Sequence, residues 1–479
     1  MILALDIGTS SVRAAIYDER GERLPDSFVK NERQIELTEQ GGAEIDAEKA
    51  LAQVARAVDD VLTLAPDAAG EIEYVAMSCF WHSLIGVDKD GTALTPVLTW
   101  ADTRAKEFVG DMRARLNEHE IHNRTGCRFH PSYWPARLLW YRSQQPEIFS
   151  RATKWLSFSD YLALKLSGEV ITSISMASGT GIFDVRRCVW DEELLSFLGI
   201  SAEKLPAIAE GGGAFQTARW EKLKNARWFP AIGDGAANNI GASCLIDKKA
   251  ALMIGTSGAM RTAFVGEPPP EIPNGLWCYR IDRKRVLIGG ALSDGGGLYA
   301  WLKNTLKIAE VDDEIESEIA RRAPDSHGLT VMPFFMGERS TGYHENASGA
   351  ILGLTQNTTA VEIVQAAMEA VAFRFAAIFD QLKTVCPVTE IIASGGALRE
   401  SLVWTQIIAD VFGRDLSLPD TREASSRGAV LLALETTGKI NNIEEIETPP
   451  GQQFRFDKKR HEVYQKARTR HEEFYKKMM

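Results

Sequence analysis

The residue with the most direct chemical use in this sequence is an aspartate between two glycines. Asp234 lies in the run Ile-Gly-Asp-Gly-Ala-Ala at residues 232–237, after an apolar segment and before a helical pattern. A carboxylate that a ligand can approach closely can accept a proton from a substrate hydroxyl. The competing interpretation is that Asp234 caps the N-terminus of the following helix, a position that aspartate favours. The pattern predicts a general base at Asp234.

A short Gly-Thr-Ser stretch occurs twice, each time between apolar runs. The copies are residues 7–10 and 254–257, and each predicts a strand, a tight turn and a second strand. Successive N–H groups and hydroxyls in such a turn form an anion-binding concavity, so two turns could hold a polyphosphate from both sides. Asp6 precedes the first turn, where an acid suits Mg²⁺, whereas Met253 precedes the second. Two ordinary glycine-containing hairpins are the alternative.

Aromatic and polar residues at the ends of predicted strands suit a polyol. Residues 80–83 (Phe-Trp-His-Ser) follow a predicted strand, and residues 99–104 (Thr-Trp-Ala-Asp-Thr-Arg) lie at a strand-to-helix junction. An aromatic ring can cover a C–H face while polar groups read hydroxyls. Each residue could instead serve packing or capping, since buried Trp is common. The His-, Arg- and aromatic-rich segment 119–141 predicts either a solvated or oligomer-contact face, or a cationic wall for an acidic substrate.

Glycines also mark two strand-to-helix junctions in the second half of the chain. Residues 293–297 (Ser-Asp-Gly-Gly-Gly) open a predicted helix, whose N-terminus is a natural partner for phosphate or ribose. At residues 391–397 a strand leads into Gly395 and Gly396, against which a flat base could lie. Close packing of helix on strand is the alternative use of these glycines.

The elements that must position these residues alternate between strand and helix. Residues 1–17 and the segment after them predict a β-meander, Asp46 caps a helix that continues to about residue 62, and strands follow at 74–79 and 84–87. This alternation indicates an α/β domain with a central sheet. Further predictions are a strand at 228–232, a small-residue loop at 175–181, a strand that begins at Pro333, and helices at 157–166, 359–379 and 458–477.

Composition narrows the class of protein. A chain of 479 residues predicts at least two domains, and a net charge of -11 argues against a nucleic-acid binder. The six cysteines are scattered, which predicts reduced packing thiols in the cytosol. Neither a signal peptide nor a membrane span is expected, and the P-loop, dinucleotide, zinc-protease and serine-hydrolase motifs are absent from the sequence.

Taken together and in order, the motifs resemble the FGGY carbohydrate kinases. The resemblance rests on the motifs at residues 6–13, 100–104, 233–237, 255–258, 337–339 and 394–397. It implies an α/β protein of two domains with the actin-like (ribonuclease H-like) ATPase fold, with ATP and Mg²⁺ in the cleft between them. The expected N-terminal domain, residues 1–245, carries the sugar site, the catalytic Asp and the first phosphate turn. Residues 246–479 form the ATP-binding domain with a terminal helix.

The resemblance also assigns roles, following the logic that phosphoryl transfer depends on positioning and charge neutralisation. Asp234 is the general base and Asp6 positions Mg²⁺. The expected nucleotide contacts are Thr9, Ser10, Arg13, Gly255, Thr256, Gly296, Gly396 and Glu400. The expected substrate contacts, besides Asp234, are His82, Trp100, Asp102 and Arg137.

Within the family the sequence is most similar to gluconokinases, which predicts phosphorylation of D-gluconate to 6-phosphogluconate. The sequence departs from the gluconokinase pattern at residues 132–134 and at Thr341. A pentulose such as xylulose or ribulose is the alternative substrate, and an actin-like ATPase driven by nucleotide or a catalytically silent relative are the alternative functions. The expected partner is a small sugar or sugar acid in the cytoplasm, with no nucleic acid or membrane, and a homodimer is left open.

Overall fold

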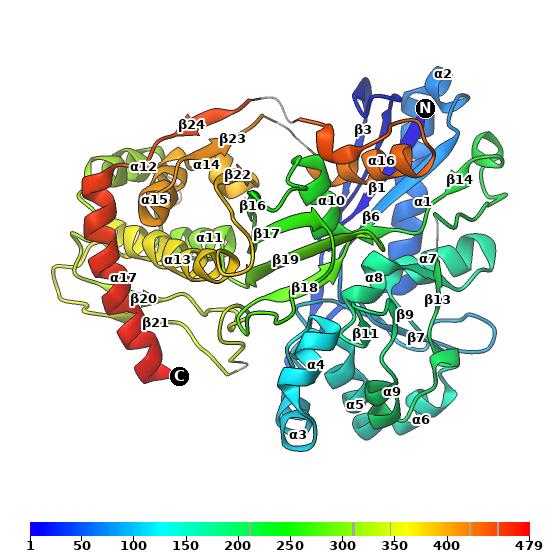
Figure 1. Cartoon of the computed structure of the whole chain (residues 1–479), viewed down its shortest axis with the longest axis horizontal. Coiled ribbons are helices and arrows are strands. Elements are labelled where there is room, and N and C mark those ends of the chain that lie inside the picture. Colours follow the sequence, from blue (N-terminus) through cyan, green and yellow to red (C-terminus); the bar gives the residue numbers. More distant parts are fainter. Residues whose placement is uncertain (210–211, 309–311, 345, 421–422, 448–449) are drawn as a thin grey trace.

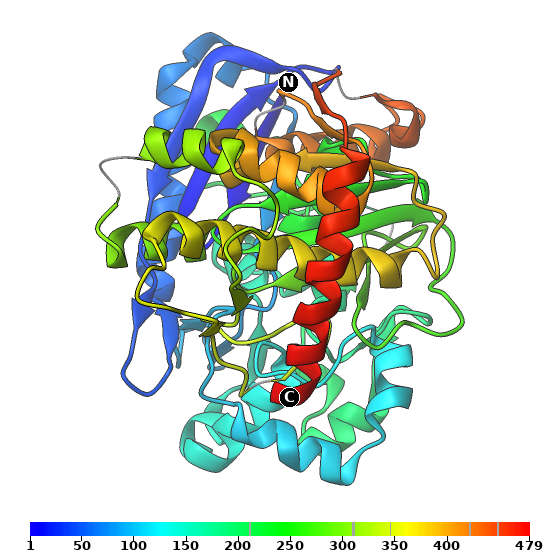
Figure 2. The same cartoon turned by 90° about the vertical axis from the view of Figure 1, so that its left-hand side faces the viewer.

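The computed structural model describes residues 1–209, 212–308, 312–344, 346–420, 423–447 and 450–479. Figure 1 shows two halves, each built on a sheet with helices packed against it. In Figure 2, the C-terminal helix crosses the face of the second half from end to end. None of the described helices combines the length and the apolar character needed to cross a bilayer.

The first sheet lies in the N-terminal half and has the strand order β14-β6-β1-β2-β3, with β15 also paired to β6. Strands β1 and β2 form an antiparallel hairpin, and β1 runs parallel to β6. The meander and the strand at 74–79 are therefore confirmed. The strands are β1 (Ile2–Ile7), β2 (Ser11–Tyr17), β3 (Arg23–Glu32), β6 (Tyr74–Cys79), β14 (Arg227–Trp228) and β15 (Ile232–Gly233).

The second sheet repeats this arrangement in the order β18-β19-β17-β16-β22-β23-β24. Here β16 and β17 form the antiparallel hairpin, and β16 runs parallel to β22. The two Gly-Thr-Ser turns therefore occupy equivalent positions in two sheets of like topology. The strands are β16 (Lys249–Ile254), β17 (Gly258–Val265), β18 (Trp277–Arg280), β19 (Arg285–Leu292), β22 (Glu390–Ser394), β23 (Leu416–Leu418) and β24 (Gln452–Phe454).

Helices of the N-terminal half cover the first sheet and build a subdomain beside it. The predicted cap of the first long helix is confirmed, because the Asp46 side chain accepts from the Lys49 N–H. The helices are α1 (Ala47–Leu64), α2 (Pro66–Ala69), α3 (Glu107–Arg115), α4 (Glu118–Thr125), α5 (Trp134–Gln144), α6 (Pro146–Arg151), α7 (Phe158–Ser167), α8 (Ile174–Ser178), α9 (Glu192–Leu198) and α10 (Asp234–Gly241). Short strands join them: β4 (Glu36–Leu37), β5 (Ala43–Ile45), β7 (Ile85–Val87), β8 (Val97–Leu98), β9 (Lys154–Leu156), β10 (Ile171–Ser173), β11 (Phe183–Asp184), β12 (Val189–Trp190) and β13 (Ala207–Ala209).

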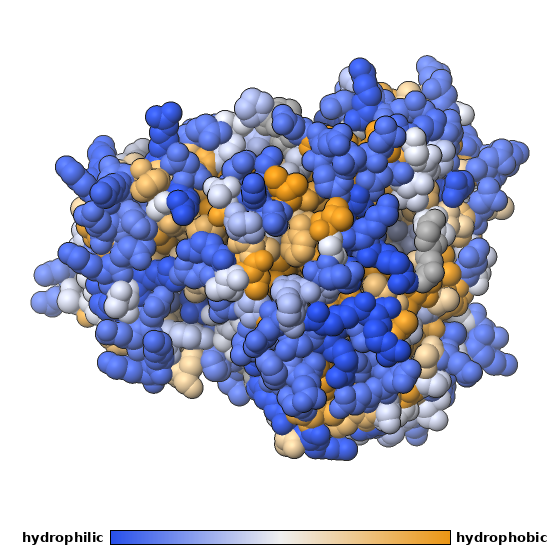
Figure 3. Space-filling model, viewed as in Figure 1, coloured by the Kyte–Doolittle hydropathy of each residue, from blue (hydrophilic) through white to orange (hydrophobic). Residues whose placement is uncertain are grey.

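The C-terminal half is organised around one long buried helix. This helix, α13 (Ala360–Leu382), begins with a capping box formed by Thr359 and Glu362. The other helices and short strands of this half are α11 (Gly296–Thr305), α12 (Asp312–Arg321), α14 (Gly396–Glu400), α15 (Leu402–Phe412), α17 (Lys458–Met478), β20 (Thr330–Met332) and β21 (Ala350–Leu352). The predicted helices at 359–379 and 458–477 are confirmed. The face drawn in Figure 3 is mostly polar, with apolar side chains gathered near its middle, between the two halves.

One helix from late in the chain belongs to the first core. Helix α16 (Ala424–Thr436) packs on α10, β6 and β1, and its buried residues join the hydrophobic cluster of the N-terminal half. Backbones of α10 and α16 touch, because a Cβ added at Gly428 would lie 1.8 Å from the Ala237 carbonyl oxygen. A division at residue 245 remains a prediction, but the packed cores do not follow it.

Other differences from the predicted elements have local causes. The first part of the loop predicted at 175–181 lies in helix α8 (residues 174–178), because the Ser173 hydroxyl accepts from the Met176 N–H and starts a helix. The strand expected from Pro333 onward lies instead just before that proline, as β20, which ends at Met332. The strand at 228–232 is divided into β14 and β15, with Pro230 between them. All six cysteines are buried and unpaired.

Candidate active site

Asp234 is the first residue of α10, directly after β15. The cap position belongs to Gly233, so the capping interpretation of Asp234 is wrong. The carboxylate accepts from the Gly235 N–H at 2.8 Å. Burial raises the pKa of Asp234 to about 6, although the Arg261 guanidinium partly offsets the increase. A carboxylate with this pKa is a suitable proton acceptor near neutral pH.

Trp81 explains why glycines flank Asp234. A Cβ at Gly233 would lie 1.8 Å from the indole, and one at Gly235 would lie 2.7 Å from it. The indole N–H donates to the Ser175 carbonyl at 2.9 Å, and the Ser175 hydroxyl accepts from the Gly233 N–H at 3.0 Å. Trp81 therefore fixes the turn that presents Asp234, a role that the sequence did not predict.

His82 follows Trp81 in a left-handed backbone conformation with φ of 67°. Its Nδ1 lies 2.6 Å from the Gly179 carbonyl oxygen, which can only accept, so Nδ1 carries the proton. Burial, reinforced by the Arg339 guanidinium, lowers the pKa of His82 well below its usual value. The ring is neutral and its Nε2 lone pair is directed at Arg339, 3.5 Å from Nη2 of that residue.

Arg137, predicted as a substrate contact, is bonded within the protein, and its contact with the substrate stays a prediction. Its guanidinium is buried and donates to three backbone carbonyls, those of Pro131, His82 and Thr99. These bonds clamp together the segments that carry His82 and Trp100. The structure therefore shows Arg137 holding the wall of the site, with its donors directed at the protein.

Asp102 is likewise occupied by the protein. It is buried, accepts from the Ala43 N–H at 3.1 Å and pairs with Arg104 at 2.6 Å. Arg104 also pairs with Glu44 at 2.6 Å. These bonds hold Asp102 in its own loop, and its predicted contact with the substrate stays a prediction. Trp100, two residues earlier, is partly exposed.

Three charged side chains lie in sequence behind the first Gly-Thr-Ser turn, which is predicted to bind phosphate. Asp6 is buried and accepts from the Ser78 hydroxyl at 2.8 Å and from Arg13 Nη1 at 3.0 Å. The same Arg13 nitrogen lies 3.4 Å from Glu423, at the start of α16. The Glu423 oxygen of this ion pair, Oε2, is buried and has no hydrogen-bond partner among the described residues. Two carboxylates with spare oxygen capacity fit Mg²⁺, although Glu423 was not predicted from the sequence. Thr9 and Ser10 lie in the turn itself, partly exposed and exposed.

The second turn is joined to the glycine-rich start of α11. The Gly296 N–H donates to the Gly255 carbonyl at 2.7 Å, and the Gly297 N–H donates to the Thr256 carbonyl at 2.9 Å. A Cβ at Gly296 would lie 2.6 Å from the Gly255 oxygen and 2.9 Å from the Ala397 methyl group. The predicted nucleotide residues of this half therefore form one wall, although the Gly296 N–H is already used.

Gly396 presents an open face on the same wall. It is exposed, and a Cβ there would meet only the Glu400 carboxylate, at 3.9 Å. Backbone of this kind offers room for a flat base beside the second turn. The predicted placement of adenosine along Gly396 and Glu400 has the space that it needs, and it stays a prediction.

Side chains of the C-terminal half also pack against the turn that carries Asp234 and against Trp81. Arg261 of β17 is buried, and its Nη1 would lie 2.1 Å from a Cβ at Gly235. Tyr279 of β18 packs edge-on against Trp81, with ring centroids 5.1 Å apart. Sequence reasoning missed both residues, because strands far apart in the chain bring them here.

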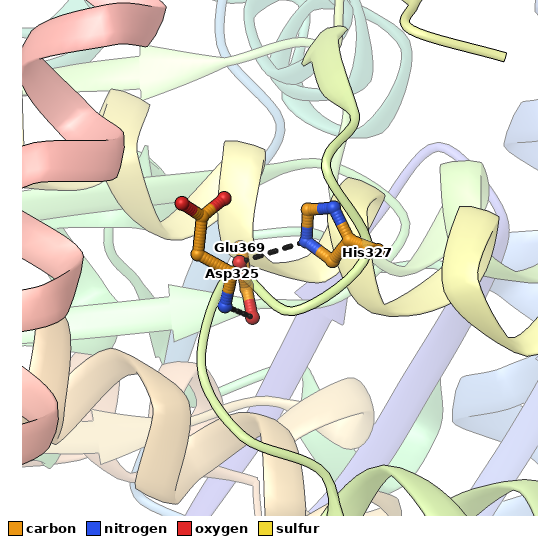
Figure 4. A group of neighbouring side chains, drawn as sticks. All are labelled: Asp325, His327 and Glu369. Atoms are coloured by element: carbon orange, nitrogen blue, oxygen red, sulfur yellow. Dashed lines mark hydrogen bonds and ion pairs between the residues drawn. The ribbon is translucent and has the colours of Figure 1, made fainter.

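A second cluster of possible ligands lies elsewhere in the C-terminal half (Figure 4). Asp325, His327 and Glu369 place ligand atoms within 4.8 Å of one another. His327 Nε2 lies 3.0 Å from Glu369, and its Nδ1 accepts from the Leu329 N–H. The Asp325 carboxylate turns away from the other two and pairs with Arg470 of α17. Its members are bonded within the protein, so the cluster stabilises the packing of α13 and α17.

Comparisons with known proteins agree over nearly the whole chain. Residues 1–265 match the N-terminal domain of the FGGY family of carbohydrate kinases, and residues 250–436 match the C-terminal domain of that family. The gluconokinase of Bacillus subtilis (strain 168) is 29% identical over 473 residues, which cover 95% of this chain and 91% of that relative.

Two solved structures superpose closely. A ligand-bound xylulose kinase from Lactobacillus acidophilus has a TM-score of 0.88 at 28% identity, covering 99% of this chain and 97% of that one. A gluconate kinase from Lactobacillus acidophilus has a TM-score of 0.88 at 29% identity with the same coverage. These likenesses confirm the predicted two-domain, actin-like α/β fold.

Proposed function

The chain belongs to the FGGY family of carbohydrate kinases, and on that premise we propose that it phosphorylates D-gluconate to 6-phosphogluconate with ATP. Carbohydrate kinase activity follows from the family. Gluconate as the substrate is supported by the likeness to the gluconokinase of Bacillus subtilis (strain 168) and to the gluconate kinase from Lactobacillus acidophilus.

The observation that carries the proposal is the state of Asp234. Its carboxylate is partly exposed at the start of α10, is bonded to its neighbour's N–H, and has a pKa raised to about 6. Trp81 holds its turn in place from one side and Arg261 packs against the turn from the other half. A fixed carboxylate of this kind can take the proton from an attacking hydroxyl as the phosphoryl group is transferred.

The other residues of the site divide the remaining work. The turn at residues 8–10 and the wall formed by Gly255, Gly296 and Gly396 would hold the triphosphate and the nucleoside from opposite halves. Asp6, with Glu423 nearby, would hold Mg²⁺, which neutralises phosphate charge when it is bound. Closure of the halves would exclude water, which would otherwise accept the phosphoryl group.

A pentulose remains the second candidate substrate, because a xylulose kinase superposes as well as a gluconate kinase does. The test is an ADP-release assay of the purified protein with gluconate, xylulose, ribulose and glycerol at equal concentration. The proposal predicts the highest kcat/KM with gluconate. Activity with pentuloses alone would replace gluconate as the substrate.

The same assay without any sugar tests the non-enzymatic alternative. An ATPase driven by nucleotide alone would release ADP at an undiminished rate in the absence of an acceptor. A kinase whose base serves a sugar hydroxyl should release it far more slowly. Rates with and without gluconate therefore separate the two functions.

A further inference from the structure

We propose that Arg339 binds the carboxylate of the substrate and so selects a sugar acid over a neutral sugar of the same length. The inference rests on the proposed function, because it assigns a recognition group within that site. Arg339 follows β20 in the C-terminal half. Its guanidinium reaches His82 of the N-terminal half, with Nη2 3.5 Å from Nε2.

The segment that carries Arg339 is fixed by the acid beside it. Glu338 is buried and accepts from Arg374 of α13 at 2.5 Å and from the Tyr475 hydroxyl of α17 at 2.7 Å. Its carboxylate thus points toward the interior of the C-terminal half. Arg339 is held on a rigid loop, and its neighbouring acid is not available to neutralise it.

The imidazole and phenol rings beside the Arg339 guanidinium are neutral, and the charges of Asp234 and Arg261 act on it from a greater distance. Burial and the charge of Arg339 lower the pKa of His82 well below its usual value and that of His130 to about 3. The phenol rings of Tyr133 and Tyr279 pack on His82 at centroid distances of 5.0 and 6.0 Å. In the described part of the chain, no carboxylate oxygen lies within 4.0 Å of the Arg339 guanidinium.

Other arginines at the site show the contrast. Arg137 donates to three backbone carbonyls, Arg104 pairs with two carboxylates, and Arg374 pairs with one. Arg261 is buried against the Asp234 turn. Arg339 is half-buried with donors to spare, and the planar fork of a guanidinium matches the two oxygens of a carboxylate.

The position of Arg339 favours a sugar acid over the nucleotide as the source of the anion. The phosphate turn at residues 8–10 has an arginine of its own, Arg13. Arg339 instead faces His82, whose Nε2 lone pair can accept from a sugar hydroxyl. A substrate that places its carboxylate at Arg339 and its far hydroxyl at Asp234 would span the site.

The experiment compares two acceptors that differ at one carbon. D-gluconate carries a carboxylate where D-glucitol carries a hydroxymethyl group. Steady-state kinetics are measured with both for the wild type, Arg339→Met and Arg339→Lys, with the exposed Arg321→Met as control. In Arg339→Met, kcat/KM for gluconate should fall roughly 10- to 100-fold, since a hydrogen bond to a charged group is lost. The value for glucitol and the KM for ATP should change little, and Arg339→Lys should recover part of the loss.

Each other outcome has a distinct meaning. If kcat/KM in Arg339→Met falls equally for gluconate and glucitol, Arg339 does not bind the carboxylate, although gluconate remains the substrate. The same conclusion follows if the KM for ATP rises instead. If the wild type does not phosphorylate gluconate but phosphorylates another sugar acid, gluconate is not the substrate and the proposed function fails. Arg339 is then tested with that acid and its alditol, and a selective loss for the acid supports it. A wild type that phosphorylates only neutral sugars overturns both the proposed substrate and the proposed role of Arg339.

Discussion

Asp6 and Met253 occupy the same position in the two sheets. Each lies two residues before the glycine of a Gly-Thr-Ser turn, and each is paired in register with a serine of the parallel neighbour strand, Ser78 or Ser394. The repeated topology thus carries a carboxylate on one side of the cleft and a thioether on the other. Because Mg²⁺ prefers oxygen ligands, the metal is expected on the N-terminal side alone.

Replacing Asp6 by Asn should therefore change the magnesium requirement. The Mg²⁺ concentration that gives half-maximal activity at fixed ATP should rise by about 10-fold or more, because a charged ligand is lost. Met253→Leu is the matched control at the equivalent position and should leave the requirement unchanged. An unaltered magnesium titration in Asp6→Asn would remove Asp6 as the metal residue.

Replacing Asp234 by Asn should abolish most of the turnover and leave nucleotide binding intact. The amide cannot take the proton of the attacking hydroxyl, so kcat should fall by roughly 100- to 10,000-fold. Steady-state kinetics measure the loss, and calorimetric titration with a non-hydrolysable ATP analogue measures the affinity. A variant that keeps a near-normal kcat would show that another group is the base.

The fall in kcat/KM on the acid side of the pH profile should reflect protonation of Asp234. Burial raises the pKa of this carboxyl to about 6, and a base works only in its ionised form. The value of kcat/KM for the sugar should therefore be fully developed at neutral pH and decline as the pH falls through about 6.

Arg261 supplies the control for that assignment. Its guanidinium lowers the pKa of Asp234, so Arg261→Met should move the acid limb to higher pH. A limb that stays in place in this variant would assign the titration to another group. The two profiles should be recorded at saturating ATP.

Gly233→Ala should destabilise the protein because the added methyl group meets the Trp81 indole, 1.8 Å from the new Cβ. Overpacking of this kind costs about 1–3 kcal/mol. Gly110→Ala in α3 is the control, since no atom lies within 4 Å of its Cβ position and the helix should gain up to about 1 kcal/mol. Denaturant unfolding measures both. Equal stability of the two variants would contradict the packing of Trp81 on this turn.

Gly396→Leu should weaken ATP without weakening the fold. The position is exposed and open, so the thermal midpoint should stay within about 2 °C of the wild type. A side chain there would occupy the space predicted for adenosine, which should raise the KM for ATP by about 10-fold. The KM for gluconate should be unaffected. If both KM values are normal, the adenosine lies elsewhere.

Local signals in the sequence were sufficient for much of the fold. The Asp46 cap and the two Gly-Thr-Ser hairpins are each encoded within a few residues, and all are present. Residues 175–181 were predicted as a loop because most of their side chains are small. The Ser173 cap that starts a helix there was the signal overlooked.

The roles of the site residues were harder to predict from the sequence, because burial and contacts with distant residues determine what a charged side chain does. Arg137 was predicted as a substrate contact, yet three of its five N–H donors bond backbone carbonyls that come from separate segments. Arg261 and Glu423 reach the site through packing between distant elements, which no local pattern records. The same kind of packing gives Trp81 a role that its place in residues 80–83 did not indicate. The flanking glycines of Asp234 were a visible hint that a large side chain lies against that turn.

The position of α16 affects how this chain folds during its synthesis on the ribosome. Residues 424–436 cover β1, β6 and α10, which are all made before residue 245. The hydrophobic core of the N-terminal half therefore remains incomplete, with part of its apolar surface exposed, while most of the second half is still being synthesised. We expect the isolated segment 1–245 to aggregate, and co-expression with the remainder to restore it only if α16 can dock in trans.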